Sequence, residues 1–358
     1  MSNEGFLTRT ECTAMKGIAI LGIMLHNYCH WLKGIARENE YTWSQWKCDR
    51  MWEVFQQPDD LLPMHLVSYF GHYGVPVFLF LSGFGLVRKY EACGAAMPSV
   101  WRFTRYNYLK LFRIFIVGFV LFTMLDAFTP GIHRYHADEV LAMLGMYANF
   151  FEHPSEVVWP GPYWYFSITL QLYILYRLVI CRWRHWVVVA GLIALCWLWQ
   201  SLYLDDAVVL ERLRYNLVGG MLPFGMGVLA ARSGMQRMPV EGSWRLRLSL
   251  LLVLILSVSL AFHCSLSSAV NWLWAPAFIV VGTIVLVKLI PTAAMPYMIW
   301  LGGISAAVFV AHPLVRKIFV RPYIHEDMYA GLLLYIVATL LVSWLVKKII
   351  DQIPSPRL

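Results

Sequence analysis

A chain of 358 residues with 59% hydrophobic and only 14% charged residues lacks the composition of a soluble domain, in which about a quarter of the residues carry a charge. This composition excludes a soluble enzyme, a disordered chain and a small disulfide-bonded scaffold. The formal net charge is +8, but in so apolar a chain the positions of the charges matter more than their sum, and we expect no nucleic-acid partner.

Apolar stretches of about 20 residues, long enough to cross a bilayer as helices, recur along the chain. The sequence predicts an all-α polytopic membrane protein, a single domain over residues 1–358, with about ten transmembrane helices and both termini cytoplasmic. A shorter stretch, Leu141–Phe151, is predicted to be an interfacial helix. The predicted spans are Lys16–Leu32, Tyr69–Val87, Leu111–Leu125, Tyr163–Tyr176, Trp186–Leu204, Tyr215–Ala231, two within Leu248–Val287 joined near His263–Asn271, Met295–Val315 and Met328–Val346.

The charges predict the orientation. With the N-terminus inside, the predicted inner segments carry 19 of the 29 basic residues but only five of the 21 acidic ones. This is the positive-inside pattern of a multi-pass plasma-membrane protein. One predicted outer loop departs from the pattern, because its basic residues outnumber its acidic ones. The basic residues of this loop are Arg316, Lys317 and Arg321, and the acidic ones are Glu326 and Asp327.

One ionisable residue lies deep within the first predicted span. At 1.5 Å per residue, His26 lies about 15 Å beyond Lys16, near the middle of the bilayer. Lipid offers an imidazole no solvation, so a histidine at this depth indicates a functional site. The alternative is a neutral ring that is hydrogen-bonded within the bundle. His312 is expected near the outer end of its span, where Pro313 disturbs the backbone bonding. The other histidines expected toward the outer side, mostly in wet or interfacial positions, are His30, His65, His72 and His263.

Two features near the predicted inner side have both a functional and a structural interpretation. In the second span, Ser82 and Gly83 allow a helix or a ligand to approach closely, and helix packing is the favoured interpretation. The segment 88–113 carries six basic residues against Glu91 alone. Such a cluster suits the phosphates of coenzyme A, but the positive-inside rule also predicts it. Arg113 is the sharper case, because it lies within the apolar pattern of the third span.

The outer loops combine aromatic rings with carboxylates. The loop 33–67 holds Tyr41, Trp43, Trp46 and Trp52 among six acidic residues, a pattern that can stack on a sugar and hydrogen-bond to it. Trp and Tyr also gather at membrane interfaces for reasons unrelated to ligands. Trp164, in the rigid segment that enters the fourth span, has the same two interpretations.

Six segments, in this order along the chain, resemble the acyltransferase 3 family of integral membrane acyltransferases. Each segment is weakly diagnostic alone, whereas the ordered set is more specific. The segments are Lys16–Leu21 with His26, Val77–Phe84, Arg105 with Lys110–Ile114, Tyr163–Tyr165 with Tyr173, Leu222–Gly227, and Gly303–Ser305 with His312–Pro313.

The resemblance implies an O-acyltransferase of the bacterial inner membrane. It would move an acyl group, usually acetyl, from cytoplasmic acyl-CoA to a hydroxyl of a cell-envelope glycan or a lipid-linked saccharide. His26 would be catalytic, as a general base or as the carrier of the acyl group. The other site residues that we expect are Lys16, Arg105, Lys110 and Arg113 at the donor, Ser82 beside its acyl arm, and Trp164 and His312 at the acceptor.

The chain departs from the family pattern twice. The family usually has arginine, ten intervening residues and then histidine, which places both side chains on nearly one helix face. Here Lys16 replaces the arginine, and His26 lies about 80° away from Lys16 around the helix. Asn27, not His26, occupies the position at which the family has its histidine. Either Lys16 makes a looser electrostatic contact than the family's arginine, or a π-bulge in the helix brings Lys16 and His26 back onto one face. The proline that commonly follows the Arg-Ile pair in the family is replaced by Phe115, which weakens the assignment of Arg113 to the donor site.

A secondary transporter that uses His26 for proton coupling would also fit ten spans. Such transporters commonly contain repeated halves with matched broken helices, and the sequence shows no such repeat. The seven cysteines form no CxxC pair, so we expect no metal. Acyl-CoA is the expected donor, membrane lipid and a glycan acceptor are the expected partners, and a homo-oligomer is left open.

Overall fold

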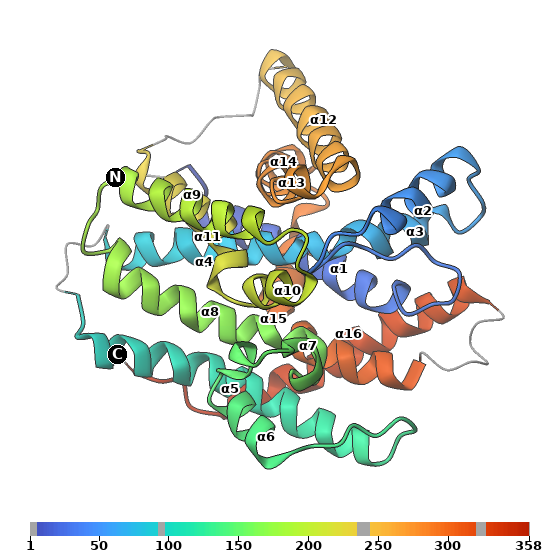
Figure 1. Cartoon of the computed structure of the whole chain (residues 1–358), viewed down its shortest axis with the longest axis horizontal. Coiled ribbons are helices and arrows are strands. Elements are labelled where there is room, and N and C mark those ends of the chain that lie inside the picture. The colour runs from blue at the N-terminus through green and yellow to red at the C-terminus, as the bar shows by residue number, and fades with distance from the viewer. Residues whose placement is uncertain (1–5, 92–96, 235–243, 320–326, 358) are drawn as a thin grey trace.

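The computed structural model describes residues 6–91, 97–234, 244–319 and 327–357. Within these ranges the regular elements are all helices and no strand occurs, which confirms the all-α prediction. Most of the long helices run across the view of Figure 1, with the two chain ends at its left and α2 (Gln45–Gln56) at its right. The cytoplasmic location of the termini stays a prediction.

Six helices of the described chain are long and apolar enough to cross a membrane. Four more helical segments lie at the other predicted spans, so the count of about ten stays a prediction. The six are α3 (Leu62–Phe70) continued by η1 (Gly71–Tyr73) and α4 (Gly74–Tyr90), α5 (Val100–Ala127), α12 (Trp244–Ser267), α13 (Ala269–Trp272) continued by α14 (Ala275–Leu289), α15 (Met295–Phe319) and α16 (Met328–Gln352). The four are α1 (Arg9–Cys29), α8 (Trp164–Leu175) with the π-helix η4 (Tyr176–Ile180), α9 (Trp186–Leu202) and α11 (Leu217–Arg232).

Short elements make up the loops. The stretch predicted as one interfacial helix is instead α6 (Ala137–Leu144) followed by the 3-10 turn η2 (Ala148–Phe150). The two are separated by Met146, whose φ of 56° lies in the left-handed region and ends the helix. The remaining short elements are α7 (Pro154–Val157), η3 (Gly161–Tyr163) and α10 (Ala207–Tyr215).

Glycines form the closest helix crossings. A Cβ at Gly302 of α15 would overlap the carbonyl of Thr13 in α1. A Cβ at Gly83 of α4 would likewise overlap the carbonyl of Phe224 in α11. Backbone approach at small residues is how helices pack in lipid, where the hydrophobic effect does not drive association. Gly83 is therefore a packing residue, the interpretation that the sequence favoured.

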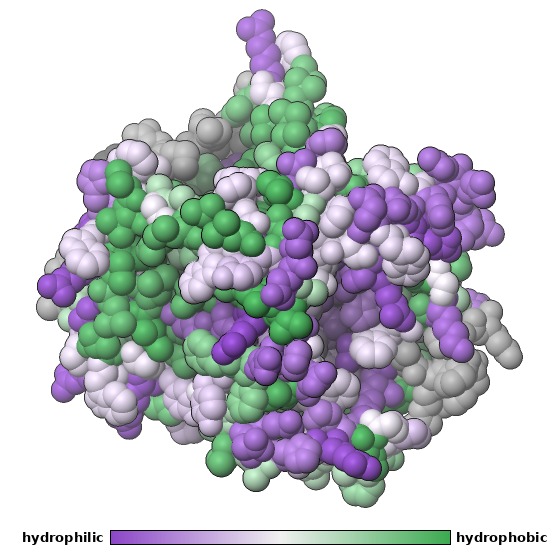
Figure 2. All heavy atoms as spheres, viewed as in Figure 1, coloured by the Kyte–Doolittle hydropathy of each residue, from purple (hydrophilic) through white to green (hydrophobic). Residues whose placement is uncertain are grey.

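The bundle exposes a large apolar surface. Hydrophobic residues cover α9 and α12 in Figure 2, and the exposed side chains there include Leu195, Leu252 and Leu256. Polar residues gather over α2 and in a hollow to the right of α10. An apolar surface with a polar end is expected of helices that face lipid.

Candidate active site

Helix α1 carries both Lys16 and His26. It begins at a capping box, in which the Thr8 hydroxyl accepts from the Glu11 amide at 3.1 Å and the Glu11 carboxylate accepts from the Thr8 amide at 2.7 Å. From Arg9 to Cys29 the helix is α-helical throughout. The π-bulge alternative is therefore wrong, and Lys16 and His26 stay about 80° apart. They line two different cavities.

The first cavity, which we call the inner cavity, has a volume of about 350 Å³ and contains Lys16. Lys89 and Lys110 add two further cations to its lining. Ser82 also lines it, and its hydroxyl accepts from the Tyr173 hydroxyl at 3.5 Å. Three of the five residues expected at the donor, Lys16, Ser82 and Lys110, thus meet in one cavity.

The other two residues expected at the donor lie elsewhere. Arg113 lines a neighbouring cavity of about 230 Å³, which shares Lys110 with the inner cavity. Its guanidinium contacts the Ser355 hydroxyl and lies 4.0 Å from the Asp351 carboxylate. Arg105 is exposed on α5 and lines neither of these cavities.

The cavity at His26, which we call the outer cavity, has a volume of about 140 Å³. Trp164, which the sequence placed at the acceptor, lies in its wall and packs edge-on against Tyr41 at 5.7 Å and Tyr215 at 5.8 Å. Aromatic rings with a few polar groups make up most of this wall. Its other members include Asn27, His30, Trp31, Glu40, His72, Trp159, Phe309 and Arg316.

Phe309 of α15 lines both cavities. Its ring lies 5.2 Å from the ring of Tyr165 and 5.7 Å from that of Phe166, and both of these residues line the inner cavity. The cavity that holds the lysines and the cavity that holds His26 therefore meet at one aromatic side chain.

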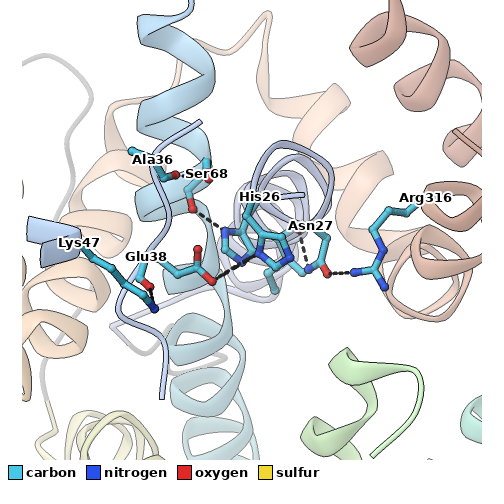
Figure 3. A network of polar contacts seen from close by, with 9 residues as sticks. His26, Asn27, Ala36, Glu38, Lys47, Ser68 and Arg316 are labelled. Carbon is cyan, nitrogen blue, oxygen red and sulfur yellow. Dashed lines mark hydrogen bonds and ion pairs between the residues drawn. The ribbon is translucent and has the colours of Figure 1, made fainter. Parts of the chain in front are cut away.

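His26 is held in a single orientation. The side chain is 2% exposed, and Nδ1 lies 2.7 Å from the carbonyl oxygen of Ser68. Because only an N–H can bond to a carbonyl, Nδ1 carries a proton, and in the neutral ring the lone pair is on Nε2. Nε2 lies 3.7 Å from Oε1 of Glu38. Figure 3 shows Ser68 and Glu38 on one side of the ring, with Asn27 and Arg316 on the other. A fixed tautomer beside a carboxylate suits a general base.

The segment 35–44, which carries Glu38 toward His26, contains no helix. It is fixed by hydrogen bonds between its backbone and distant side chains. The Ala36 amide donates to His65 Nδ1 at 2.9 Å, and the Ala36 carbonyl accepts from the Ser68 hydroxyl at 2.6 Å. The Glu38 carbonyl accepts from Lys47 Nζ at 2.7 Å. Since these backbone groups have partners, they can be buried within this irregular segment at low cost.

The two carboxylates of this segment differ in their protonation. Burial alone would raise the pKa of Glu38, but the imidazoles of His26 and His30, when protonated, outweigh burial and hold this pKa below its usual range. Burial, and to a smaller extent the charge of Glu38, raises the pKa of Glu40 to about 7. Glu38 is therefore held anionic while an imidazole beside it carries a proton, whereas Glu40 can gain or lose a proton near neutral pH.

A family model for an acyltransferase domain matches residues 11–348, nearly the whole chain. The chain belongs to the acyltransferase 3 family. It is accordingly a multi-pass membrane acyltransferase, and the transporter alternative is not favoured. The comparisons with curated proteins and with solved structures give no match.

Several histidines of the acyltransferase lie deeper than the sequence predicted. His65 and His72 are buried, so wet or interfacial positions are wrong for them, while His263 is exposed as expected. The ring of His72 lies 5.5 Å from that of His26. His312 is 0% exposed and does not line the outer cavity. It is also not at a helix end, because α15 continues through Pro313 to Phe319.

One of the charges that broke the positive-inside pattern, Arg316, lines the outer cavity. The sequence placed Arg316 in an outer loop, whereas the structure places it in α15, buried, with Nη1 donating to Oδ1 of Asn27 at 3.1 Å. Arg321 and Glu326 lie outside the described residues. Sequence reasoning did not assign Asn27, Glu38, Glu40 or Arg316 to the site. The departure from the charge pattern was the one signal that pointed to Arg316.

Proposed function

We propose that this acyltransferase moves an acetyl group from cytoplasmic acetyl-CoA to a hydroxyl of a cell-envelope glycan or lipid-linked saccharide, at the inner membrane of a bacterium. The observation that carries the proposal is the pair of cavities that meet at Phe309. A soluble donor on one side of a bilayer and a saccharide on the other need a site with two entrances. One cavity offers cations, and the other offers a histidine base among aromatic rings.

The inner cavity suits the donor. Coenzyme A carries several phosphate charges, and ammonium groups bind phosphates as point charges. Lys16, Lys89 and Lys110 supply three such groups in one cavity. From there the thioester arm extends past Ser82 toward Phe309. The rise of α1 from Lys16 to His26 sets the required reach at about 15 Å.

The outer cavity suits the chemical step. Nε2 of His26 takes the proton of the acceptor hydroxyl while the hydroxyl oxygen attacks the thioester carbonyl. The bond between carbon and sulfur then breaks, and the thiolate of coenzyme A leaves with the proton that the imidazolium returns. The anionic Glu38, 3.7 Å away, stabilises the imidazolium in between. In the second route that the same lone pair allows, Nε2 attacks the thioester carbonyl and the carbon–sulfur bond breaks to release the coenzyme A thiolate. The acceptor hydroxyl then attacks the acetyl group, the bond to Nε2 breaks, and the hydroxyl proton goes to the thiolate.

The wall of the outer cavity suits a saccharide acceptor. The faces of Trp164, Tyr41 and Tyr215 offer stacking surfaces, and Glu40 and Arg316 offer hydrogen-bonding groups. His312 packs 5.9 Å from the ring of Phe309. We therefore assign acceptor contact to Trp164 and not to His312.

Labelled acetyl-CoA incubated with membranes that contain the protein tests this function. We expect label in the glycan fraction and an equal amount of free coenzyme A. Mass spectrometry of glycans from cells with and without the protein then identifies the acceptor. Uptake of a saccharide or small anion without consumption of acetyl-CoA would contradict the proposal and favour the transporter.

Lys110→Ala is expected to raise the KM for acetyl-CoA roughly tenfold or more, since a hydrogen bond to a charged group contributes about 1.5–3 kcal/mol. Arg105→Ala is the matched control, because it removes a cation from the same helix outside the two cavities that hold Lys110. We expect its KM to change less than about threefold. Initial rates at varied acetyl-CoA measure both, and equal effects would place the phosphates over the exposed face of α5.

Trp164→Ala is expected to raise the KM for the acceptor about three- to tenfold with little change in the KM for acetyl-CoA, because one stacking surface is lost. Trp52→Ala is the control, since Trp52 is exposed on α2 and does not line the outer cavity. The comparison uses the glycan fraction identified above as the varied substrate. A rise confined to the KM for acetyl-CoA would argue against acceptor binding here.

A further inference from the structure

We propose that His26, His30 and Glu38 form a zinc site whose occupation blocks the transfer reaction. Nε2 of His26 lies 3.2 Å from Nδ1 of His30, and Oε1 of Glu38 lies 3.7 Å and 3.4 Å from these two nitrogens. Zinc holds imidazole nitrogens and carboxylate oxygens at about 2.0–2.1 Å, so two ligand atoms of a tetrahedron lie about 3.3–3.4 Å apart. The three observed separations match the edges of one face of that tetrahedron.

The two histidines have the spacing of a metal site. His26 lies in the last turn of α1, and His30, four residues further on, is its C-cap residue with helical φ and ψ, so the two lie on one face. Paired histidines at this spacing bind zinc in helical metalloprotease motifs. The bond from Nδ1 of His26 to the Ser68 carbonyl, at 2.7 Å, fixes the tautomer whose lone pair is on Nε2, and a metal bound there replaces the hydrogen bond between Nε2 and Nδ1 of His30.

Glu38 lacks hydrogen bonds that would account for its burial. Its side chain is 9% exposed, and Oε2 has no hydrogen-bond partner within the described chain. Oε1 lies beyond the distance of about 2.7–2.9 Å at which a charged imidazole donates to a carboxylate. Buried carboxylates are stable when they are paired closely or bind a metal. A cation held between Oε1 and the two imidazoles supplies the missing partner.

His72 adds a second observation at the same place. The residue is 6% exposed, and neither ring nitrogen has a hydrogen-bond partner among the described residues. Its ring lies 5.5 Å from that of His26, and both residues line the outer cavity. The fourth zinc position is left to a water molecule from that cavity, to which His72 can hydrogen-bond.

Imidazole and carboxylate ligands with tetrahedral spacing favour zinc among the divalent metals. The metal would use the lone pair of Nε2 that the proposed reaction needs for the proton or the acetyl group. The metal-bound and reactive states of His26 therefore exclude each other. The site itself is independent of the proposed function, and only the inhibition rests on it.

The first test measures binding. The full-length protein is purified in detergent, stripped with a chelator and titrated with Co²⁺, followed by competition with Zn²⁺. We expect one metal per chain, with visible absorption typical of a tetrahedral Co²⁺ site. Removing a ligand should weaken binding more than about 100-fold, beyond the effect of losing a group that only orients a ligand. The ligand variants are His30→Ala and Glu38→Gln, and His153→Ala, an exposed outer-loop histidine, is the control.

Zn²⁺ should also raise the melting temperature of the wild type and of His153→Ala, but not of Glu38→Gln, because binding stabilises only a protein that has the site. Equal affinity in the wild type and both ligand variants would overturn the metal site, and so would a site that the His153 change removes. Because these readouts do not involve catalysis, they remain decisive if no acyl transfer is detected.

The second test measures inhibition. Transfer by the wild type should fall as Zn²⁺ fills the site, with half-inhibition at the Kd from the titration, and a chelator should restore it. His153→Ala should show the same sensitivity. Transfer that is lost on chelation and restored by zinc would overturn the blocking role, since the ion would then be required by the reaction.

Discussion

His26→Ala is expected to lower acetyl transfer by about 10²–10⁴-fold, the usual contribution of a positioned general acid or base. The variant removes the lone pair of Nε2, which both proposed routes use. It should leave the KM for acetyl-CoA nearly unchanged, because the inner cavity does not include His26. Initial rates with labelled acetyl-CoA, at saturating donor, measure the effect.

A matched control separates chemistry from folding. His26→Ala removes the imidazole and leaves the Ser68 carbonyl without its hydrogen-bond partner. This costs about 1–3 kcal/mol of folding stability, so a moderate fall in melting temperature is expected. Ser68→Ala removes the hydroxyl that bonds to Ala36 but keeps the carbonyl, so it should destabilise the segment 35–44 while leaving far more activity. Undiminished transfer in His26→Ala, at equal amounts of folded protein, would refute the assignment.

Gly302→Val is expected to destabilise the bundle by about 1–3 kcal/mol or more, because overpacking where two backbones meet has little room to relax. A side chain at Gly302 would overlap the backbone carbonyl of Thr13. Separating α15 from α1 also moves Phe309 relative to Lys16 and His26, so activity should fall together with stability. Melting of the purified protein in detergent measures the change.

The next residue provides the control. Gly303 is exposed, and a Cβ there would meet no atom of the described chain within 4 Å. Gly303→Val should therefore change stability by no more than about 0.5 kcal/mol. Similar melting temperatures for the two variants would show that α1 and α15 do not approach as closely as the glycines indicate.

The helices were the more predictable part of this protein. Apolar length and charge placed a helix at each predicted span, and helical geometry placed Lys16 and His26 on different faces of α1. The same geometry does not reveal which cavities those faces line. That depends on α15 and on Phe309, nearly 300 residues further along the chain. The family resemblance supplied the link between these segments.

The segment 35–44 shows why the rest of the site escaped prediction. Its position depends on partners 29 residues away for Ala36 and His65, and 174 residues away for Glu40 and Arg214. No local periodicity encodes such contacts, so Glu38 read as one acidic residue among six in an outer loop. Arg316 was misplaced for another reason. The apolar pattern ends before it, although α15 continues to Phe319.

The partition at Phe309 also has an electrical consequence. A water-filled passage from one face of the bundle to the other would conduct protons and discharge the membrane potential, which is worth about 2.3 kcal/mol per charge for each 100 mV. In the proposed reaction, the acetyl group passes Phe309, the residue that lines both the inner and the outer cavity. A packed ring at this position would let the proposed transfer cross the membrane without an open water-filled path for ions.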